Sequence, residues 1–510
     1  MAQFDLEEIL KAANGTLLSG SGSGIYPAIS IDSRTIGKGE LFIAIKGKNF
    51  DGHDFVLQAL RRGAGGAIIS DKNLPLNLVI RGLKEKIGDK PRHNIILVKD
   101  TLKALHDIAN HHRKKFNIPV IGITGSNGKS TSKEMSASVA SVRLNILKNE
   151  GNLNNQIGLP LTLLKMNDSH QAAILEMGMN ERGEIEKLSR IAEPTVGLIT
   201  NIGKAHLENL GSMENIRDAK GELIRTIGEN GTAILNSDDP LAAELKNGFK
   251  GRVITFGINS PSEITAFDIK KDKDSGYRFV LKMDGRDTAV SLSYPGYHNI
   301  YNALSAAAVG KSLGIAIDDI KKGIESFKPL PMRMERFVID DGIIIINDAY
   351  NANPSSMEAA IKTLSETISS GKKFLVIGDM LELGGASEDA HRYIGRLVAS
   401  LFLQGQGRRT IDYLITLGEQ SRFAFYEAVR SGMPRDRAYC AENSDEAAFI
   451  LDDELESGDC VMIKGSRGMK MENVVERIIG IRRQKSEDRS QKTKDKVQDE
   501  EDVCLLSSVF

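Results

Sequence analysis

Short apolar runs recur along the central part of the chain, and helical patterns lie between most of them. The runs are IPVIGITG (118–125), AAILEMG (172–178), VGLITNIG (196–203), GTAILNSDD (231–239) and RVITFG (252–257). Short runs that are apolar throughout are typical of strands buried in a parallel sheet. Because these strands alternate with helices, the pattern predicts an α/β fold with a largely parallel sheet.

The same alternation continues on both sides of this central part. Shorter strand-like and helical pieces fill the first hundred residues, and a second α/β series starts after ESFKPLPMRMERF (325–337). A chain of 510 residues is too long for one ordinary core. We therefore predict an α/β protein of three domains: an N-terminal α/β domain at 1–98, a central parallel-sheet domain at 99–330 and a C-terminal Rossmann-like α/β domain at 331–482. Residues 483–510 are mixed in charge and predict a disordered tail.

Composition and charge exclude several classes of partner and location for this chain. The chain has 67 basic and 68 acidic residues, so neither nucleic acid nor an anionic membrane is favoured. No apolar run reaches the roughly 18 to 20 residues of a membrane span, and the N-terminus lacks the pattern of a signal peptide. The cysteines (Cys440, Cys460 and Cys504) have no metal-ligand spacing, and their low number fits a reducing compartment. We expect a cytoplasmic protein.

The stretch GITGSNGKST (122–131) follows the first central strand and has the character of a phosphate loop. Backbone N–H groups of Gly125–Gly128 can surround phosphates at a helix N-terminus, with Lys129 as the cation and Ser130 as a ligand of Mg²⁺. A strict P-loop has glycine where this chain has Ile123. A turn that only caps a helix is the structural alternative, but a lysine–serine pair directly after a buried strand favours nucleotide binding.

Ionisable residues follow the next two strands. Glu176 ends a strand, and a carboxylate there lies on the ligand-binding edge of a parallel sheet, where it can hold Mg²⁺ or its water. His206 trails the following strand on the same edge, which favours a metal or phosphate role over a structural one. Lys220 would repel a nearby Mg²⁺, and carbamylation of its amine would remove that conflict.

Two asparagine-bearing stretches have both a structural and a functional interpretation. NEGNLNNQIGLPLTLL (149–164) suits a loop, in which asparagine side chains bind backbone or ligand. YPGYHNIYNALSAAAV predicts a helix of small residues with His298, Asn299 and Asn302 near its first turn. Helix packing explains the alanines, and a purine or ribose contact could explain the asparagines.

Taken together, nine ordered stretches make the chain resemble the Mur ligase family, ATP-dependent amide-forming enzymes of peptidoglycan synthesis. They are SRTIGKGELFIAIKGKNFDGHDF, GITGSNGKSTSKEM, GNLNNQIGLPLTLL, EMGMNERGEI, GKAHLENLGSMENIRDAKGEL, GYHNIYNALSAAA, NDAYNANPSSMEAA, GDMLELG and IKGSRGMKMENVV. The resemblance runs from about residue 1 to 482, and the family's own loop accepts Ile123. It is nearest to the members that join D-alanyl-D-alanine to a UDP-N-acetylmuramoyl-tripeptide.

The resemblance implies ATP and Mg²⁺ as cofactors and a catalytic set in the central domain. Lys129 and Ser130 would hold the ATP phosphates and one Mg²⁺, Glu176 and His206 would bind a second Mg²⁺, and Lys220 matches a lysine that several members carbamylate. The other residues that the resemblance assigns to the nucleotide site are Gly125, Ser126, Asn127, Gly128, Thr131, Asn155, Asn302, Arg333, Asp348 and Asn351.

The resemblance also implies where the two substrates bind. Ser33 and Arg34 match the N-terminal region that holds the UDP-sugar, and GDMLELG (378–384) matches the region that handles the incoming dipeptide. The expected partners are UDP-N-acetylmuramoyl-tripeptide and D-alanyl-D-alanine, with no nucleic acid and no membrane span, and we expect a monomer. Whether the third residue of the peptide is lysine or diaminopimelate stays open.

Three alternatives compete with this interpretation. A folylpolyglutamate-synthase-like ligase shares the chemistry but has less reason for the N-terminal GELFIAIKG and DGHDF stretches. A sister Mur ligase that adds a diamino acid would carry an Asp-Asn-Pro-Arg run, which this chain lacks. A nucleotide-dependent switch would bind ATP without ligation, and it would release phosphate without any amine acceptor.

Overall fold

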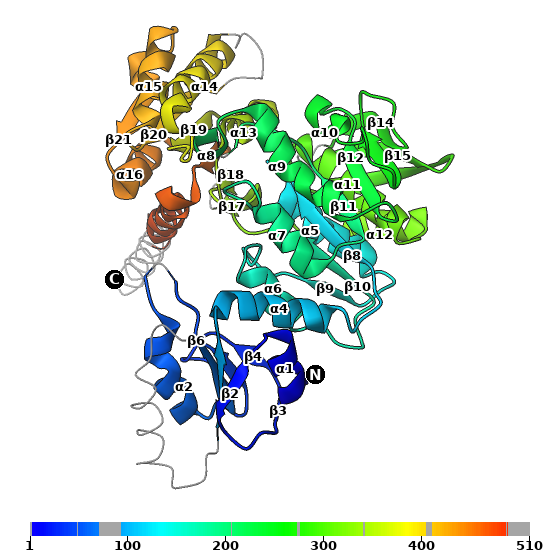
Figure 1. The fold of residues 1–510 in the computed structure, drawn as a ribbon. Helices are drawn as coiled ribbons and strands as arrows, with labels where there is room; N and C mark the ends of the chain where they lie inside the picture. The colour runs from blue at the N-terminus through cyan, green and yellow to red at the C-terminus, as the bar shows by residue number, and fades with distance from the viewer. Residues whose placement is uncertain are drawn as a thin grey trace, which may run out of the picture.

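Three α/β domains follow one another along the chain, and each is built on its own main sheet (Figure 1). The first domain is blue in Figure 1, the second cyan to light green, and the third yellow to red. The computed structural model describes residues 3–47, 49–70, 93–205, 207–272, 276–339, 342–403, 411–485 and 487.

The N-terminal domain contains a five-stranded sheet in the order β2-β7-β6-β5-β4. Strands β4 to β7 are parallel and β2 is antiparallel to β7, while β1 and β3 form a separate pair. The elements are β1 (Phe4–Asp5), α1 (Leu6–Ala12), β2 (Thr16–Ser19), β3 (Ile25–Tyr26), β4 (Ile29–Ser30), β5 (Leu41–Ile43), η1 (Gly52–Phe55), α2 (Val56–Arg62), β6 (Gly66–Ser70) and β7 (Asn94–Val98).

Helix α4 (Thr101–Arg113) joins this domain to the next one. Asp100 caps its N-terminus by accepting hydrogen bonds from the backbone of Leu102 and Lys103, the usual role of aspartate at such a position. The helix contacts α1 on one side and the helices of the central domain on the other. One continuous apolar core therefore extends from the first domain into the second.

The central domain contains a nine-stranded sheet in the order β16-β15-β14-β13-β12-β11-β8-β10-β9. Pairing is parallel from β9 across to β14 and antiparallel from β14 to β16. The elements are β8 (Val120–Thr124), α5 (Lys129–Ala140), β9 (Ile146–Lys148), α6 (Gly158–Leu163), β10 (Ala172–Glu176), α7 (Glu184–Ala192), β11 (Val196–Ile199), α8 (Leu207–Leu210), α9 (Met213–Thr226), β12 (Thr232–Asn236), α10 (Pro240–Glu244), β13 (Arg252–Gly257), β14 (Ile264–Lys271), β15 (Tyr277–Met283), β16 (Arg286–Leu292), α11 (His298–Ser312) and α12 (Ile317–Ser326).

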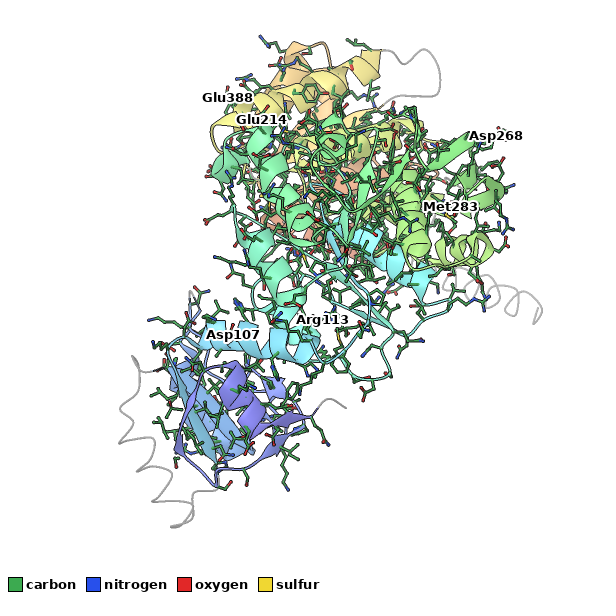
Figure 2. All side chains as sticks on the ribbon, turned by 45° about the vertical axis from the view of Figure 1, so that its right-hand side comes forward. Asp107, Arg113, Glu214, Asp268, Met283 and Glu388 are labelled. Carbon is green, nitrogen blue, oxygen red and sulfur yellow. The ribbon has the colours of Figure 1, made fainter. Side chains whose placement is uncertain are left out.

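Helices cover both faces of the central sheet. Side chains of α4, α6, α7 and α9 form the core on one face, and those of α5, α11 and α12 form it on the other. The innermost strands are buried along their whole length, which explains their β-branched and aliphatic sequences. Figure 2 shows Asp268 and Met283 in the antiparallel part, across the central domain from Asp107 and Arg113 of α4, which lie next to the N-terminal domain.

The C-terminal domain contains a six-stranded sheet in the order β17-β18-β22-β19-β20-β21, parallel except for the β17–β18 pair. Its last helix spans residues 472–485. The other elements are β17 (Glu335–Ile339), β18 (Ile343–Asp348), α13 (Pro354–Glu366), β19 (Lys373–Gly378), η3 (Gly384–Ala386), α14 (Ser387–Leu403), β20 (Tyr413–Leu417), α15 (Ser421–Arg430), η4 (Arg435–Arg437), β21 (Ala438–Ala441), α16 (Ser444–Glu454), β22 (Cys460–Lys464) and η5 (Arg467–Met469).

The predicted fold class is confirmed: the chain folds into three α/β domains with mainly parallel sheets. The antiparallel strands β14 to β16 were not predicted. The main sheets lie within the predicted domain ranges, but the exact boundaries stay predictions. No helix in the described part of the chain is long and apolar enough to cross a membrane.

The last helix passes the predicted domain boundary at residue 482. Helical residues 483–485 lie within the tail predicted to be disordered, and residues 488–510 of that tail lie outside the described residues. The Arg482 Nη2 atom donates to the carbonyl oxygens of Asp452 (2.6 Å) and Leu455 (2.9 Å) at the end of α16. The guanidinium also pairs with the Asp452 carboxylate. The last helix is therefore fastened to α16 by a charged group at a helix C-terminus.

We expect Arg482→Ala to lower the free energy of unfolding by about 2 kcal/mol, because two carbonyl groups lose a charged donor. Urea unfolding of the purified protein measures the change. Arg483→Ala is the matched control, because Arg483 is exposed and has no hydrogen bond to any other described residue. Equal stability of the two variants would contradict the proposed role of Arg482.

Candidate active site

A cavity of about 780 Å³ lies between the central and C-terminal domains. The carboxyl ends of β8, β10 and β11 open into it from the central domain, and the loops after β18 and β22 line it from the C-terminal domain. Most of the predicted nucleotide-site residues line it together: Ser126, Asn127, Gly128, Lys129, Ser130, Thr131, Asn155, Glu176, Asn302, Arg333, Asp348 and Asn351.

Two glycines allow the phosphate loop to adopt its shape. Gly128 has a φ of 78°, and a Cβ atom there would lie 2.6 Å from Asn302 Oδ1. Gly125 has a φ of 153°, and a Cβ atom there would lie 1.9 Å from Thr200 Oγ1. Both positions therefore combine a left-handed backbone with too little space for a side chain. The loop can approach its neighbours this closely only with glycine at both positions.

The end of β11 supports the phosphate loop from the side. The backbone N–H of Asn127 donates to Asn201 Oδ1 (2.9 Å), and Thr200 Oγ1 donates to the Asn127 carbonyl oxygen (2.6 Å). The Ser126 hydroxyl exchanges hydrogen bonds with the backbone of Gly203. Sequence reasoning did not assign Thr200 or Asn201, although polar residues directly after a buried strand were the available signal.

Lys129 is the first residue of α5, and its ammonium group lies inside the loop. Its Nζ atom donates to the carbonyl oxygens of Gly125 (2.8 Å) and Ser126 (3.3 Å). Burial lowers the pKa of Lys129, and the nearby Glu176 carboxylate opposes that change. A phosphate in the loop would meet this cation and the backbone N–H groups at the start of the helix.

Glu176 is buried at the end of β10, and its two carboxylate oxygens differ in their contacts. Its Oε1 atom accepts a hydrogen bond from Asn154 Nδ2 (2.7 Å), whereas its buried Oε2 atom has no hydrogen-bond partner among the described residues. A carboxylate oxygen left without a partner in a polar cavity fits a hard cation such as Mg²⁺. The Ser130 hydroxyl lines the same cavity and offers a second oxygen donor.

His206, the other predicted metal ligand, lies outside the described residues. Within the described part of the chain, no three His, Cys, Asp or Glu side chains are grouped as a metal site. Of the predicted metal ligands, the two that are described are thus Glu176 and Ser130, and both line this cavity. The assignment of His206 stays a prediction.

Lys220 lies in α9 and does not line the cavity. It is 1% exposed, and no hydrogen bond or ion pair reaches its amine among the described residues. Burial, assisted by the charge of Lys129, lowers the pKa of Lys220 well below its ordinary value. Burial therefore disfavours the charged form of this amine.

Arg333 reaches across from the C-terminal domain to the phosphate loop. Its Nη2 atom donates to Ser130 Oγ (2.9 Å), and its guanidinium carbon lies 3.9 Å from the centre of the Tyr350 ring. The stacking fixes the orientation of the guanidinium plane over the cavity. The charge of Arg333 also lowers the pKa of Lys129, which places both cations at the same site.

Lys464 is a cavity residue that sequence reasoning did not assign. Its Nζ atom donates to Asp348 Oδ2 (2.6 Å) and to the Asn351 carbonyl oxygen (2.9 Å). This buried cation links Asp348 and Asn351, two of the three C-terminal residues that were predicted for the nucleotide site. Its position at the end of an apolar strand, within the stretch IKGSRGMKMENVV, was the sequence feature that could have identified it.

Helix α13 of the C-terminal domain contacts the central domain at both of its ends. At its N-terminus, Asn353 Nδ2 donates to Asn127 Oδ1 (2.7 Å), and Asn127 Nδ2 donates to Ser355 Oγ (2.8 Å). At its C-terminus, Tyr277 Oη donates to Glu366 Oε2 (3.4 Å), and Lys271 donates to the Glu366 carbonyl oxygen. The phosphate loop thus has direct hydrogen bonds to the domain that covers it.

The two predicted asparagines make internal hydrogen bonds. Asn155 Oδ1 accepts from the backbone of Ile157 and Gly158 at the start of α6, while its neighbour Asn154 contacts Glu176. Asn302 Oδ1 accepts from the Ser132 hydroxyl (3.1 Å). Both residues line the cavity, and their predicted role toward a nucleotide stays a prediction.

Ser33 and Arg34 lie in the N-terminal domain and do not line this cavity. The Ser33 hydroxyl donates to Gln58 Oε1 (3.0 Å), and the exposed Arg34 forms a two-bond ion pair with Asp32. The structure therefore places the residues predicted to hold the UDP-sugar on a domain separate from the phosphate loop.

A three-domain α/β fold whose phosphate loop faces a cavity covered by the third domain defines an ATP-dependent enzyme of the ligase type. Family profiles match in three parts: "Mur ligase family, catalytic domain" at residues 26–113, "Mur ligase middle domain" at 123–310, and "Mur ligase, glutamate ligase domain" at 332–467. The chain belongs to the Mur ligase family. The resemblance inferred from the sequence is confirmed.

Similar proteins cover nearly the whole chain. The UDP-N-acetylmuramoyl-tripeptide–D-alanyl-D-alanine ligase of Bacillus subtilis (strain 168) is 36% identical over 480 residues, which is 94% of this chain and 99% of the relative. A MurF crystal structure from Acinetobacter baumannii has a TM-score of 0.82 at 29% identity and covers 94% of this chain and 99% of its own. A MurF ligase from Thermotoga maritima in complex with ADP has a TM-score of 0.76 at 27% identity, with 90% and 98% covered.

Asp238 organises the loop after β13 at the edge of the cavity. It accepts backbone hydrogen bonds from Ile258, Asn259 and Ser260, and one from the Tyr301 hydroxyl (2.8 Å). Burial raises its pKa, but the hydrogen bonds from Asn259 and Ile258 and from Tyr301 outweigh burial and lower the pKa to about 2. The ionised carboxylate therefore stabilises the folded state.

We expect Asp238→Asn to lower the free energy of unfolding by about 1 kcal/mol at neutral pH, after allowance for solvent screening. A depressed pKa in the folded state stabilises the protein above the unfolded-state pKa of about 4, and this contribution is lost as the pH falls toward about 2. Urea unfolding at several pH values should show the difference from wild type narrowing on acidification. A difference that stays constant with pH would contradict this account.

Proposed function

We propose that the protein is an ATP-dependent ligase that joins D-alanyl-D-alanine to UDP-N-acetylmuramoyl-tripeptide through an acyl-phosphate intermediate. The product is the pentapeptide precursor of peptidoglycan. Two kinds of observation support the proposal: the chemistry of the cavity, and relatives with this printed activity that match more than nine-tenths of the chain. The proposal includes ATP and Mg²⁺ as cofactors and a cytoplasmic location.

One observation carries the chemical part of the proposal. Glu176, whose Oε2 atom has no hydrogen-bond partner in the described part of the chain, lines one cavity with Lys129 and Ser130. A carboxylate oxygen, a lysine cation and a hydroxyl at a helix N-terminus are the groups that a metal–nucleotide complex needs. The Thermotoga maritima relative was crystallised with ADP, which is consistent with a nucleotide in the corresponding place.

The first step activates the peptide carboxylate. A carboxylate does not condense with an amine directly because its leaving group would be oxide. Attack of a carboxylate oxygen on the γ-phosphorus forms an acyl phosphate and releases ADP. Lys129 and Arg333 approach the cavity from opposite domains, where they would neutralise charge on the transferred group. Mg²⁺ bound at Glu176 and Ser130 would supply further positive charge to the phosphates.

The second step forms the amide bond. The dipeptide amine attacks the acyl carbon, the tetrahedral intermediate collapses, and inorganic phosphate leaves while the nitrogen loses a proton. The predicted dipeptide region 378–384 is in the C-terminal domain, and its η3 segment contacts α8 of the central domain. Glu382 of this region lines the cavity. Closure of the domains would thus bring the amine to the acyl phosphate and keep water away.

The choice of amine acceptor tests the proposed function. With UDP-N-acetylmuramoyl-tripeptide and ATP, we expect steady-state turnover, measured as ADP formed over many cycles, to require D-alanyl-D-alanine and to fall at least about a hundredfold with diaminopimelate or lysine. The reason is that an extra buried ammonium without an acidic partner costs several kcal/mol. Lys129→Ala, which removes the cation of the phosphate loop, gives the background rate of ADP formation. Faster turnover of a diamino acid with the dipeptide nucleotide would identify the sister enzyme, and phosphate release without any amine would indicate a switch.

We also propose that Lys220 is carbamylated. Burial favours the neutral form of its amine, which can attack CO₂, and loss of one proton then leaves a carbamate that carries a negative charge. The conflict between a lysine cation and Mg²⁺ would then disappear.

We expect a carbamate carbon signal in the NMR spectrum of the native protein after exchange with ¹³C-bicarbonate, and no such signal in Lys220→Ala. The variant should lose most of its ligation activity, and short carboxylic acids should restore part of it. Lys133→Ala is the control for the loss of a buried lysine from the spectrum, because Lys133 is as buried as Lys220 but already has hydrogen-bond partners. A spectrum without a signal specific to Lys220 would refute carbamylation.

A further inference from the structure

Asn149 holds both backbone groups of the candidate metal ligand. Its Oδ1 atom accepts from the Glu176 N–H (2.9 Å), and its Nδ2 atom donates to the Glu176 carbonyl oxygen (2.9 Å). The same Nδ2 atom donates to the Leu153 carbonyl oxygen (2.9 Å), and the side chain is fully buried. The Asn149 amide therefore makes three hydrogen bonds to backbone groups, and two of them are to Glu176.

This contact replaces a missing piece of the sheet. Strand β9 pairs with β10 only as far as Lys148 opposite Ile174, so the ladder ends before Glu176. On the other side, β10 still pairs with β8, where Glu176 lies opposite Ile123. The Asn149 amide supplies to Glu176 a donor and an acceptor of the kind that a β9 strand two residues longer would have offered. The end of β10 is thereby held on both sides.

A buried lysine holds Asn149 in turn. The Lys133 Nζ atom donates to the Asn149 carbonyl oxygen (2.5 Å) and pairs with Glu134 Oε1 (2.9 Å), and its side chain is 1% exposed. Lys133 lies in α5, four residues and thus about one turn after Lys129. One helix therefore carries both the cation of the phosphate loop and the anchor of the loop that holds Glu176.

We propose that Asn149 and Lys133 are positioning residues that fix the Glu176 carboxylate for its metal. Their chain of contacts runs from α5 through Lys133 and Asn149 to the backbone of Glu176. It sets the distance between the phosphate loop and the Oε2 atom that has no partner. This inference rests on the proposed function only in that it takes Glu176 as a ligand of the metal–nucleotide complex.

The alternative is that Asn149 only stabilises the fold, and another asparagine provides the comparison. Asn94 is also buried, and its amide likewise bonds to two backbone groups, the Ser21 N–H (3.1 Å) and the Ser23 carbonyl oxygen (3.0 Å). It lies in the N-terminal domain and does not line the cavity. A substitution at Asn94 should therefore cost stability without changing the metal site.

The test measures Mn²⁺ binding in the presence of ADP by electron paramagnetic resonance, together with thermal melting. We expect Asn149→Leu, which keeps the side-chain size but removes the amide, to weaken Mn²⁺ binding about tenfold to a hundredfold. The matched Asn94→Leu variant should bind Mn²⁺ as tightly as wild type. Ligation by Asn149→Leu should recover in part at high Mg²⁺. Wild-type Mn²⁺ affinity in folded Asn149→Leu would overturn the proposal.

A second pair of variants covers the case in which Asn149→Leu does not fold. Lys133→Met should weaken Mn²⁺ binding about tenfold, whereas Lys148→Met should not, although both lysines pair with the same Glu134 carboxylate. Equal Mn²⁺ affinities in this pair would overturn the role of Lys133 and of its link to Asn149. Since Mn²⁺ and ADP bind without peptide or amine, a loss of metal affinity supports the positioning role even if ligation requires a different acceptor.

Discussion

The parallel register of three neighbouring strands is the constraint on which the site depends. Strand β8 pairs with β10 so that Ile123 lies opposite Glu176, and with β11 so that Thr124 lies opposite Ile199. All three strands therefore end at one level of the central sheet, and their loops open into one cavity. A shift of one residue in the β8–β10 pairing would turn the Glu176 side chain to the other face of the sheet. This register therefore brings together the phosphate loop, the carboxylate and the supporting residues after β11.

The C-terminal domain completes a site that the central domain only begins. Arg333 contacts Ser130, Asn353 contacts Asn127, and both contacts end on the phosphate loop. A bound nucleotide would compete for the Ser130 hydroxyl and would have Arg333 within reach. The loop is therefore the point at which nucleotide binding and the arrangement of the domains influence each other. This arrangement suits a reaction whose two substrates arrive on different domains.

Much of the fold followed from patterns of apolar residues, because buried parallel strands have short, continuous apolar runs. Glu176 and Lys129 could be located for the same reason, since each follows such a run directly. Strands β14 to β16 were not found because they alternate buried and exposed residues and carry many charges. Asn149 and Lys133 could not be assigned from sequence, because their roles depend on β9 ending two residues before Glu176 is paired. The local sequence pattern does not indicate where the pairing of two strands ends.

Helix α13 has a mechanical consequence that follows from its two attachments. Its thirteen residues span about 20 Å at the usual helical rise, and the central domain binds it at both ends. A rod fastened at two points cannot swivel about either of them. Separation of the domains must therefore break the contacts at Asn127 and at Tyr277 together, or bend the helix. The antiparallel strands that carry Tyr277 thus give α13 a second attachment point far from the phosphate loop. A displacement at either end of the helix is transmitted to the other end.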